Sequence, residues 1–118
     1  DPAAPTIHPL AAPADASLRG IDGLDRARRS LVASQNGVAP ARLLRIDLDP
    51  SGLAIDAVTT LAAGLPSFDD PTLVRVAGDR FYVVANSHWN HVDRDGHVPP
   101  DADRWSGPLV LEGPHGAP

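Results

Sequence analysis

The clearest pattern in the chain is the alternation of apolar and polar side chains over short segments. Residues 42–48 (RLLRIDL) alternate charged and apolar residues in their second half, which is the period of a half-buried strand. Residues 81–85 (FYVVA) are nearly all apolar, as in a strand buried on both faces. Asn36-Gly37 and residues 49–52 (DPSG) are turn sequences between such segments. The pattern therefore predicts short strands joined by tight turns.

These signals place a series of strands along the chain. A helix is the competing interpretation for residues 54–61, because apolar residues there also lie near helical spacing. A further extended segment at residues 6–10 contains Pro9 and is restricted to a sheet edge, because proline cannot donate to the ladder. The other predicted strands are residues 21–27, 31–35, 42–48, 54–61, 72–77, 81–85 and 108–111.

The strands follow a pattern that occurs twice. Each copy runs from an acidic turn through an apolar stretch, a charged turn and a second apolar stretch ending in Asn. Aligning Asp22 with Asp70 gives a period of 48, and aligning Asn36 with Asn86 gives 50. A period near fifty built of short strands is typical of propeller blades. We therefore predict an all-β fold of antiparallel four-stranded meanders, forming about two blades of a six-bladed β-propeller.

The repeat also sets the expected boundaries within a single partial propeller region, residues 1–118. Residues 5–12 are predicted as the outer strand of a preceding blade, residues 20–64 as a complete blade, and residues 68–112 as an incomplete final blade. The chain contains no Met, so we expect it to be a piece of a longer protein. Two blades alone leave sheet edges open. We expect missing blades or self-association to cover them, and a compact, cooperatively melting monomer would contradict this.

Composition and charge exclude several functions. The net charge is −5 and no basic stripe is concentrated anywhere, so we expect no nucleic-acid partner. Arg26, Arg28 and Arg29 form a local cluster that is either a solvated loop or an anion contact. The absence of Cys excludes disulfide and thiolate chemistry. No signal peptide or apolar run of about 20 residues is present, so we expect no membrane association, and the localisation stays open.

Five short segments between residues 18 and 112 carry a family resemblance. The chain at these segments is similar to six-bladed propellers of the gluconolactonase, senescence-marker and luciferin-regenerating family. The resemblance implies that the chain holds the C-terminal blades of a metal-dependent lactone hydrolase that acts on a small-molecule substrate. The segments are residues 20–24 (GIDGL), 35–38 (QNGV), 42–49 (RLLRIDLD), 70–72 (DPT) and 82–87 (YVVANS).

The acidic turns of the repeat provide the candidate site. Asp22 and Asp70 are expected at the mouth of the central channel, where carboxylates from several blades can converge on one hard cation. Asn36 and Asn86 are added as candidate ligands, since Ca²⁺ takes about six to eight oxygens from carboxylates, amides, backbone and water. The alternative is turn chemistry, in which Asp caps the start of a strand and Asn tolerates a left-handed conformation.

The resemblance implies a divalent ion at this site, which is calcium, zinc or manganese. It also implies that an Asp of a Pro-Asp-Gly turn serves as catalytic base, and Asp22-Gly23 matches the last two residues of that turn. Ile21 stands in place of the Pro, and Asp70 is followed by Pro71 rather than Gly. The family's early carboxylate ligand has no counterpart in this chain. Asp22 is therefore the candidate catalytic residue.

A second group of candidate ligands follows the strand at residues 81–85. The imidazoles of His88 and His91 are three residues apart, and carboxylates lie close behind them in the sequence, a combination that can bind Zn²⁺. The alternative is a solvated loop, because no helix is predicted to align these side chains. Asp93, Asp95 and His97 belong to the same loop, and its DRDG sequence lacks the Glu of a calcium loop.

The sequence therefore supports one leading function with one alternative. The parent protein is a lactone-hydrolase-like propeller in which an ion polarises the carbonyl and Asp22 activates water. This segment alone is expected to be inactive, so its classification as an enzyme stays open. The alternative is a non-catalytic propeller module that binds a protein partner or a small ligand.

Overall fold

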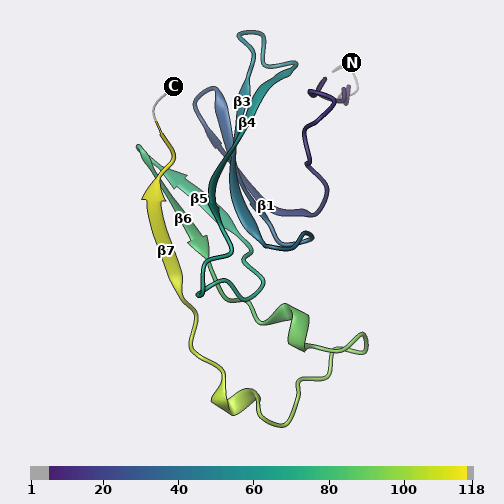
Figure 1. The fold of residues 1–118 in the computed structure, drawn as a ribbon, viewed down its shortest axis with the longest axis vertical. Coiled ribbons are helices and arrows are strands. Elements are labelled where there is room, and N and C mark those ends of the chain that lie inside the picture. Colours follow the sequence, from purple (N-terminus) through teal and green to yellow (C-terminus); the bar gives the residue numbers. More distant parts are fainter. Residues whose placement is uncertain (1–5, 117–118) are drawn as a thin grey trace, which may run out of the picture.

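The computed structural model describes residues 6–116 as two antiparallel sheets, drawn in Figure 1. The first sheet contains β1 (Ile21–Ala27), β2 (Ser30–Gln35), β3 (Arg42–Leu48) and β4 (Ile55–Ala63), in that order. The second contains β5 (Val74–Ala77), β6 (Arg80–Val84) and β7 (Val110–Pro114). The segment between β6 and β7 includes the 3₁₀ helices η1 (Trp89–His91) and η2 (Ala102–Arg104). Within the described range, no helix has the length and apolar character that a membrane crossing requires.

The strand order confirms the predicted all-β fold of antiparallel meanders. The first sheet is a four-stranded meander, and the second is a three-stranded sheet, as expected for a complete and an incomplete propeller blade. The helix alternative for residues 54–61 is wrong. Most of that segment belongs to β4, which pairs with β3 from Leu48–Ile55 to Arg42–Ala63. The β-branched residues of this segment favour such a pleated surface over a helix.

The N-terminal segment differs from its prediction. Residues 6–10 contain no strand, and residue 5 of the predicted outer strand lies outside the described range. Within the described residues, the β-pairing of this segment with the first sheet is limited to one parallel bridge between Ala11 and Ala54, in which Ile55 N–H donates to the Ala11 carbonyl oxygen at 2.7 Å. Pro9 and Pro13 flank this bridge and lack the N–H groups that a longer ladder needs. Proline therefore limits the pairing to one point.

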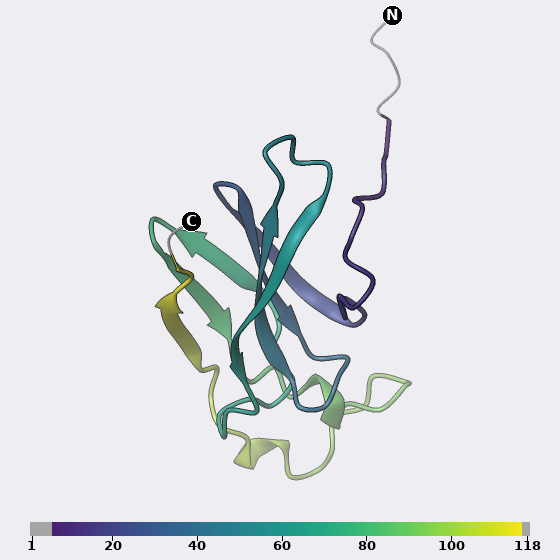
Figure 2. The same cartoon turned by 45° about the horizontal axis from the view of Figure 1, so that its top comes forward.

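The main hydrophobic core lies between the two sheets, which stand side by side in Figures 1 and 2. Leu43 of β3 and Val83 of β6 are fully buried in it, and Phe81 is 7% exposed. The next residue along β3, Leu44, points to the other face of the first sheet, because successive side chains alternate. There it joins a second buried cluster, against which Leu18 of the N-terminal segment packs. The first sheet is thus packed on both faces.

The first strands of the two sheets, β1 and β5, approach each other closely. A Cβ atom placed on Gly23 would lie 2.6 Å from Ser34 Oγ and 3.0 Å from the backbone nitrogen of Val74. Two residues along β1, Asp25 Oδ2 accepts a hydrogen bond from Val76 N–H of β5 at 2.8 Å. Arg75 lies 3.7 Å from the same carboxylate oxygen. The close approach at Gly23, which has no side chain, and the partly buried carboxylate of Asp25 therefore join the two sheets.

The Asp25 hydrogen bond makes part of this contact depend on pH. The N–H group of Val76, and after it that of Arg26, hold the pKa of Asp25 below its ordinary value. The folded-state pKa is therefore below the unfolded value of about 3.9, so the stabilisation is present above about pH 4 and is lost as pH falls through the folded pKa. Asp25→Asn should lower the free energy of unfolding by about 1 kcal/mol at pH 7.

Denaturant unfolding of wild type and Asp25→Asn at pH 7 and pH 3 measures this effect. The difference between the two proteins should shrink at the lower pH. Asp56→Asn is a matched control, because Asp56 is exposed on β4 and far from β5 in sheet order. A loss in Asp25→Asn that is the same at both pH values, or equal to that of the control, would show that the charge of Asp25 does not join the sheets.

Candidate functional site

One end of the molecule gathers the loops that carry the candidate residues. In an antiparallel meander, alternate connections lie at the same end. The register places the starts of β1, β3, β5 and β7 at this end, along with the last residues of β2, β4 and β6. The long segment with η1 and η2 lies beyond it at the bottom of Figure 1. This end, made of residues 64–73 and 85–109 with the start of β1 and the turn after β2, is termed the loop end.

Asp22 is exposed at the loop end, at the start of β1. Two neighbouring side chains donate hydrogen bonds to its carboxylate. Its Oδ2 accepts hydrogen bonds from Thr72 Oγ1 at 2.5 Å and from Asn36 Nδ2 at 3.2 Å. Thr72 lies just before β5, whereas Asn36 follows β2. The Asp22 carboxylate therefore bridges the two sheets and contacts Asn36, which is one of the predicted candidate ligands.

Asp70 lies close enough to Asp22 for their charges to interact. Its backbone has a left-handed φ of 60°, which Asp tolerates better than most residues, and its carbonyl oxygen accepts a hydrogen bond from Ser87 Oγ at 2.7 Å. Burial, and then the charges of Asp22 and Asp69, raise the pKa of Asp70. The two predicted carboxylates thus share one region of the loop end.

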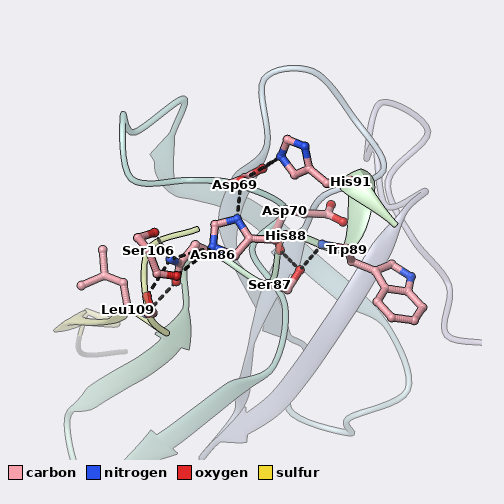
Figure 3. Close-up of polar contacts among 10 residues, drawn as sticks. Asp69, Asp70, Asn86, Ser87, His88, Trp89, His91, Ser106 and Leu109 are labelled. Atoms are coloured by element: carbon pink, nitrogen blue, oxygen red, sulfur yellow. Dashed lines mark hydrogen bonds and ion pairs between the residues drawn. The ribbon is translucent and has the colours of Figure 1, made fainter. Parts of the chain in front are cut away.

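Asn86 has a different role from the other predicted ligands. It is only 7% exposed, and its side chain closes the long segment between β6 and β7. Asn86 Nδ2 donates to Ser106 Oγ at 2.9 Å and to the Gly107 carbonyl oxygen at 3.0 Å, and Oδ1 accepts from Leu109 N–H at 2.6 Å (Figure 3). These bonds use the amide within the second sheet, away from Asp22.

The structure also assembles a cluster that the sequence did not predict as a unit. Asp69 Oδ2 lies 2.6 Å from His88 Nδ1 and 3.0 Å from His91 Nε2, as Figure 3 shows. The ligand-capable atoms of these three side chains all lie within 4.8 Å of one another. His88 is the most enclosed, with 14% of its side chain exposed, whereas His91 is 47% exposed.

Local backbone structure explains why the three side chains meet. Asp69 and Asn86 form a parallel bridge, and Ser87 N–H donates to the Asp69 carbonyl oxygen at 3.0 Å. His88 then adopts a left-handed φ of 55° and starts the η1 turn, in which His91 N–H donates to the His88 carbonyl oxygen at 3.0 Å. A 3₁₀ turn has about three residues, so side chains three apart lie on one side.

The spacing of the two histidines was the one sequence signal for this cluster. Without a predicted helical turn it did not indicate that the imidazoles face each other. Asp69 carried no signal, because its place beside His88 depends on pairing between segments that are 19 residues apart. Residues 87–104 form a long connection in which the sequence did not predict the turns η1 and η2.

The environment of the cluster favours an ionised carboxylate beside one enclosed and one half-exposed imidazole. Burial alone would raise the pKa of Asp69, but hydrogen bonds from His88, Asn90 and His91 together lower it below its ordinary value. Trp105 lies against both imidazoles, with ring centroids 5.0 Å from His88 and 5.6 Å from His91. The indole forms an apolar wall on one side of the cluster.

Comparisons with known protein families, curated proteins and solved structures found no match to this chain. The resemblance to the gluconolactonase family therefore stays a prediction. The function has to be argued from the loop end itself.

Proposed function

We propose that the loop end is part of the substrate-binding mouth of a propeller hydrolase that opens cyclic esters, with Asp22 as the base that activates water. The observation that supports this proposal is the meeting of side chains from both sheets around one exposed carboxylate. Asp22 comes from the first sheet, and Thr72 and Asp70 come from the approach to the second.

Opening a lactone by water requires a group that takes a proton from the attacking water molecule. The hydrogen bonds from Thr72 and Asn36 both go to Oδ2 of Asp22. Its Oδ1 receives no hydrogen bond from any residue within 6–116, so this oxygen is the one that can face water. Thr72 and Asn36 fix the orientation of the carboxylate, which general-base catalysis requires.

The divalent ion implied by the family resemblance does not fit the predicted ligand set in this chain. Asp22 and Asp70 offer carboxylate oxygens, but Asn36 turns its NH₂ group toward Asp22. The Asn86 oxygen is bound to Leu109 N–H. Calcium takes about six to eight oxygen ligands, which is more than these side chains supply. The proposed role of Asp22 therefore uses no ion at this position.

The expected result is a loss of lactone hydrolysis when Asp22 is replaced by Asn. The amide still accepts hydrogen bonds from Thr72 and Asn36 but cannot take a proton from water. The rate constant kcat should fall by about 100-fold or more, which is the range that a general base contributes. The measurement is hydrolysis of a panel of lactones by the intact parent protein, with Asp56→Asn as the matched control. Turnover that Asp22→Asn leaves unchanged would remove Asp22 from the mechanism.

A second candidate function is favoured by the outer face of the second sheet. Leu73, Tyr82 and Val110 are 67%, 38% and 55% exposed there and line a shallow, mostly apolar groove. Large exposed apolar residues gathered on one sheet face indicate an interaction surface. This surface fits another sheet of the same kind, either a further blade or a second copy of the chain. A wild-type protein that hydrolyses no lactone but associates through this face would favour a binding module.

A further inference from the structure

We infer that Asp69, His88 and His91 form a binding site for a transition-metal ion of the zinc type. The site lies in the loops of the second sheet and does not include Asp22, Asn36 or the Asn86 amide. The inference goes beyond the proposed hydrolase function, because metal binding to these side chains can be measured without any turnover.

The chemistry of the three side chains selects the kind of ion. Two imidazole nitrogens and one carboxylate oxygen are ligands that suit Zn²⁺ and related ions, whereas calcium prefers a shell of oxygens. Three protein ligands leave the fourth tetrahedral position of Zn²⁺ open to water or to another molecule. The set is therefore typical of an accessible site rather than of a closed structural zinc.

The distances between the three ligand-capable atoms are close to those found around a bound Zn²⁺ ion. Asp69 Oδ2 lies 2.6 Å from His88 Nδ1 and 3.0 Å from His91 Nε2. Ligand atoms around tetrahedral Zn²⁺ lie about 2.0–2.2 Å from the ion and hence roughly 3.4 Å from one another. The three atoms must separate by several tenths of an ångström to admit the ion. His91 is half-exposed on a single 3₁₀ turn, so its side chain has room for this shift.

The surroundings of His88 fix the orientation of its ring. His88 Nε2 lies 3.1 Å from the Ser106 carbonyl oxygen. The Asp69 carboxylate can only accept, so in the absence of an ion Nδ1–H donates to it, and an ion that binds Nδ1 displaces this proton. The Ser106 carbonyl oxygen also only accepts, so it can keep hold of Nε2–H while Nδ1 binds the ion. Metal-ligating histidines typically donate their other N–H to such an oxygen. Trp105 against the ring adds a wall that limits access of water.

A second acidic and imidazole group, formed by Asp93, Asp95 and His97, does not share these features. All three residues are exposed. The Asp93 carboxylate accepts hydrogen bonds from the N–H groups of Asp95 and His97 at 2.9 Å and 2.8 Å, so it stabilises its own turn. No enclosed carbonyl orients the His97 ring in the described structure. This group supplies the matched control.

The test is a titration of the 118-residue chain with Zn²⁺ by calorimetry and with Co²⁺ by its visible absorption. Wild type should bind one ion per chain, and the Co²⁺ spectrum should be that of a tetrahedral site. His91→Asn and Asp69→Asn should each weaken Zn²⁺ binding by more than the roughly 10–100-fold cost of losing an outer partner of a ligand. His97→Asn should bind like wild type.

Thermal unfolding separates a lost site from a lost fold. Zn²⁺ should raise the melting temperature of wild type and His97→Asn, since an ion that binds the folded state stabilises it. It should leave the melting temperature of His91→Asn unchanged, although without Zn²⁺ that variant should melt close to wild type. The absence of a bound ion in wild type would overturn the inference. So would a loss of binding in His97→Asn with full binding in His91→Asn.

Discussion

Gly23→Ala is expected to lower the free energy of unfolding by about 3 kcal/mol, at the upper end of the usual cost of overpacking a core. The new Cβ would lie 2.6 Å from Ser34 Oγ, 3.0 Å from the Val74 nitrogen and 3.1 Å from the Leu73 Cα. Two of these three atoms belong to the backbone at the start of β5. They cannot move without separating β5 from β1, so the core between the sheets has to open.

Chemical denaturation of Gly23→Ala and of two companion variants tests this account. Gly107→Ala makes the same change where no atom lies within 4 Å of the new Cβ, and it should stay within about 0.5 kcal/mol of wild type. In the double variant Gly23→Ala with Ser34→Ala, the closest contact is removed but the backbone contacts remain, so stability should recover only in part. Equal stability of Gly23→Ala and Gly107→Ala would contradict the close packing of β1 on β5.

Asn86→Ala is the second substitution for which we expect a large loss of stability. Its amide makes three short hydrogen bonds in a position that is only 7% exposed. Alanine leaves the Leu109 N–H and the Gly107 carbonyl oxygen without their partner, at a cost of about 1–3 kcal/mol for each buried group. We expect a loss of about 3 kcal/mol and release of the start of β7 from β6.

Two further variants identify the bonds responsible. Asn36→Ala is the matched control, because Asn36 holds the corresponding place in the first repeat but makes one longer bond, to Asp22 at 3.2 Å. It should cost less than about 1 kcal/mol. Asn86→Asp keeps the acceptor for Leu109 N–H but loses both donors, so hydrogen exchange at Leu109 should stay slower than in Asn86→Ala. Equal exchange at Leu109 in the two Asn86 variants, or equal stability of Asn86→Ala and Asn36→Ala, would contradict the assigned role.

The strands were predictable because their signals are local. Alternation in residues 42–48, the apolar run at residues 81–85 and the turn at residues 49–52 each depend on neighbours in the sequence. The N-terminal segment failed as a strand because its prolines restrict the ladder to one bridge at Ala11. Pro9 indicated an edge strand, but Pro9 and Pro13 together leave room for only one bridge.

The candidate site was predictable only in part. Asp22 and Asp70 lie at one end of the molecule, since both precede or begin the first strand of a sheet. Their place at the mouth of a channel stays a prediction. The repeat treated Asn36 and Asn86 as equivalent, although burial gives Asn86 a structural role within the second sheet. Position in a repeat specifies where the backbone runs, but the solvent and the neighbours decide what a polar side chain does.

The imidazole cluster shows what lies beyond a local pattern. His88 and His91 face one side only because the chain turns into η1 shortly after β6. Asp69 joins them through backbone pairing with the segment that follows β6. Neither a short turn nor a long-range bridge leaves a strong pattern in the sequence, and the cluster depends on both.

The most direct test of the metal site is X-ray anomalous scattering from crystals of the chain grown with Zn²⁺, recorded on both sides of the zinc absorption edge. We expect one strong anomalous peak between Asp69, His88 and His91, with Ser106 still accepting from the His88 ring. A peak at Asp22 and Asp70, a peak at Asp93 and His97 in its place, or no peak at all would contradict it.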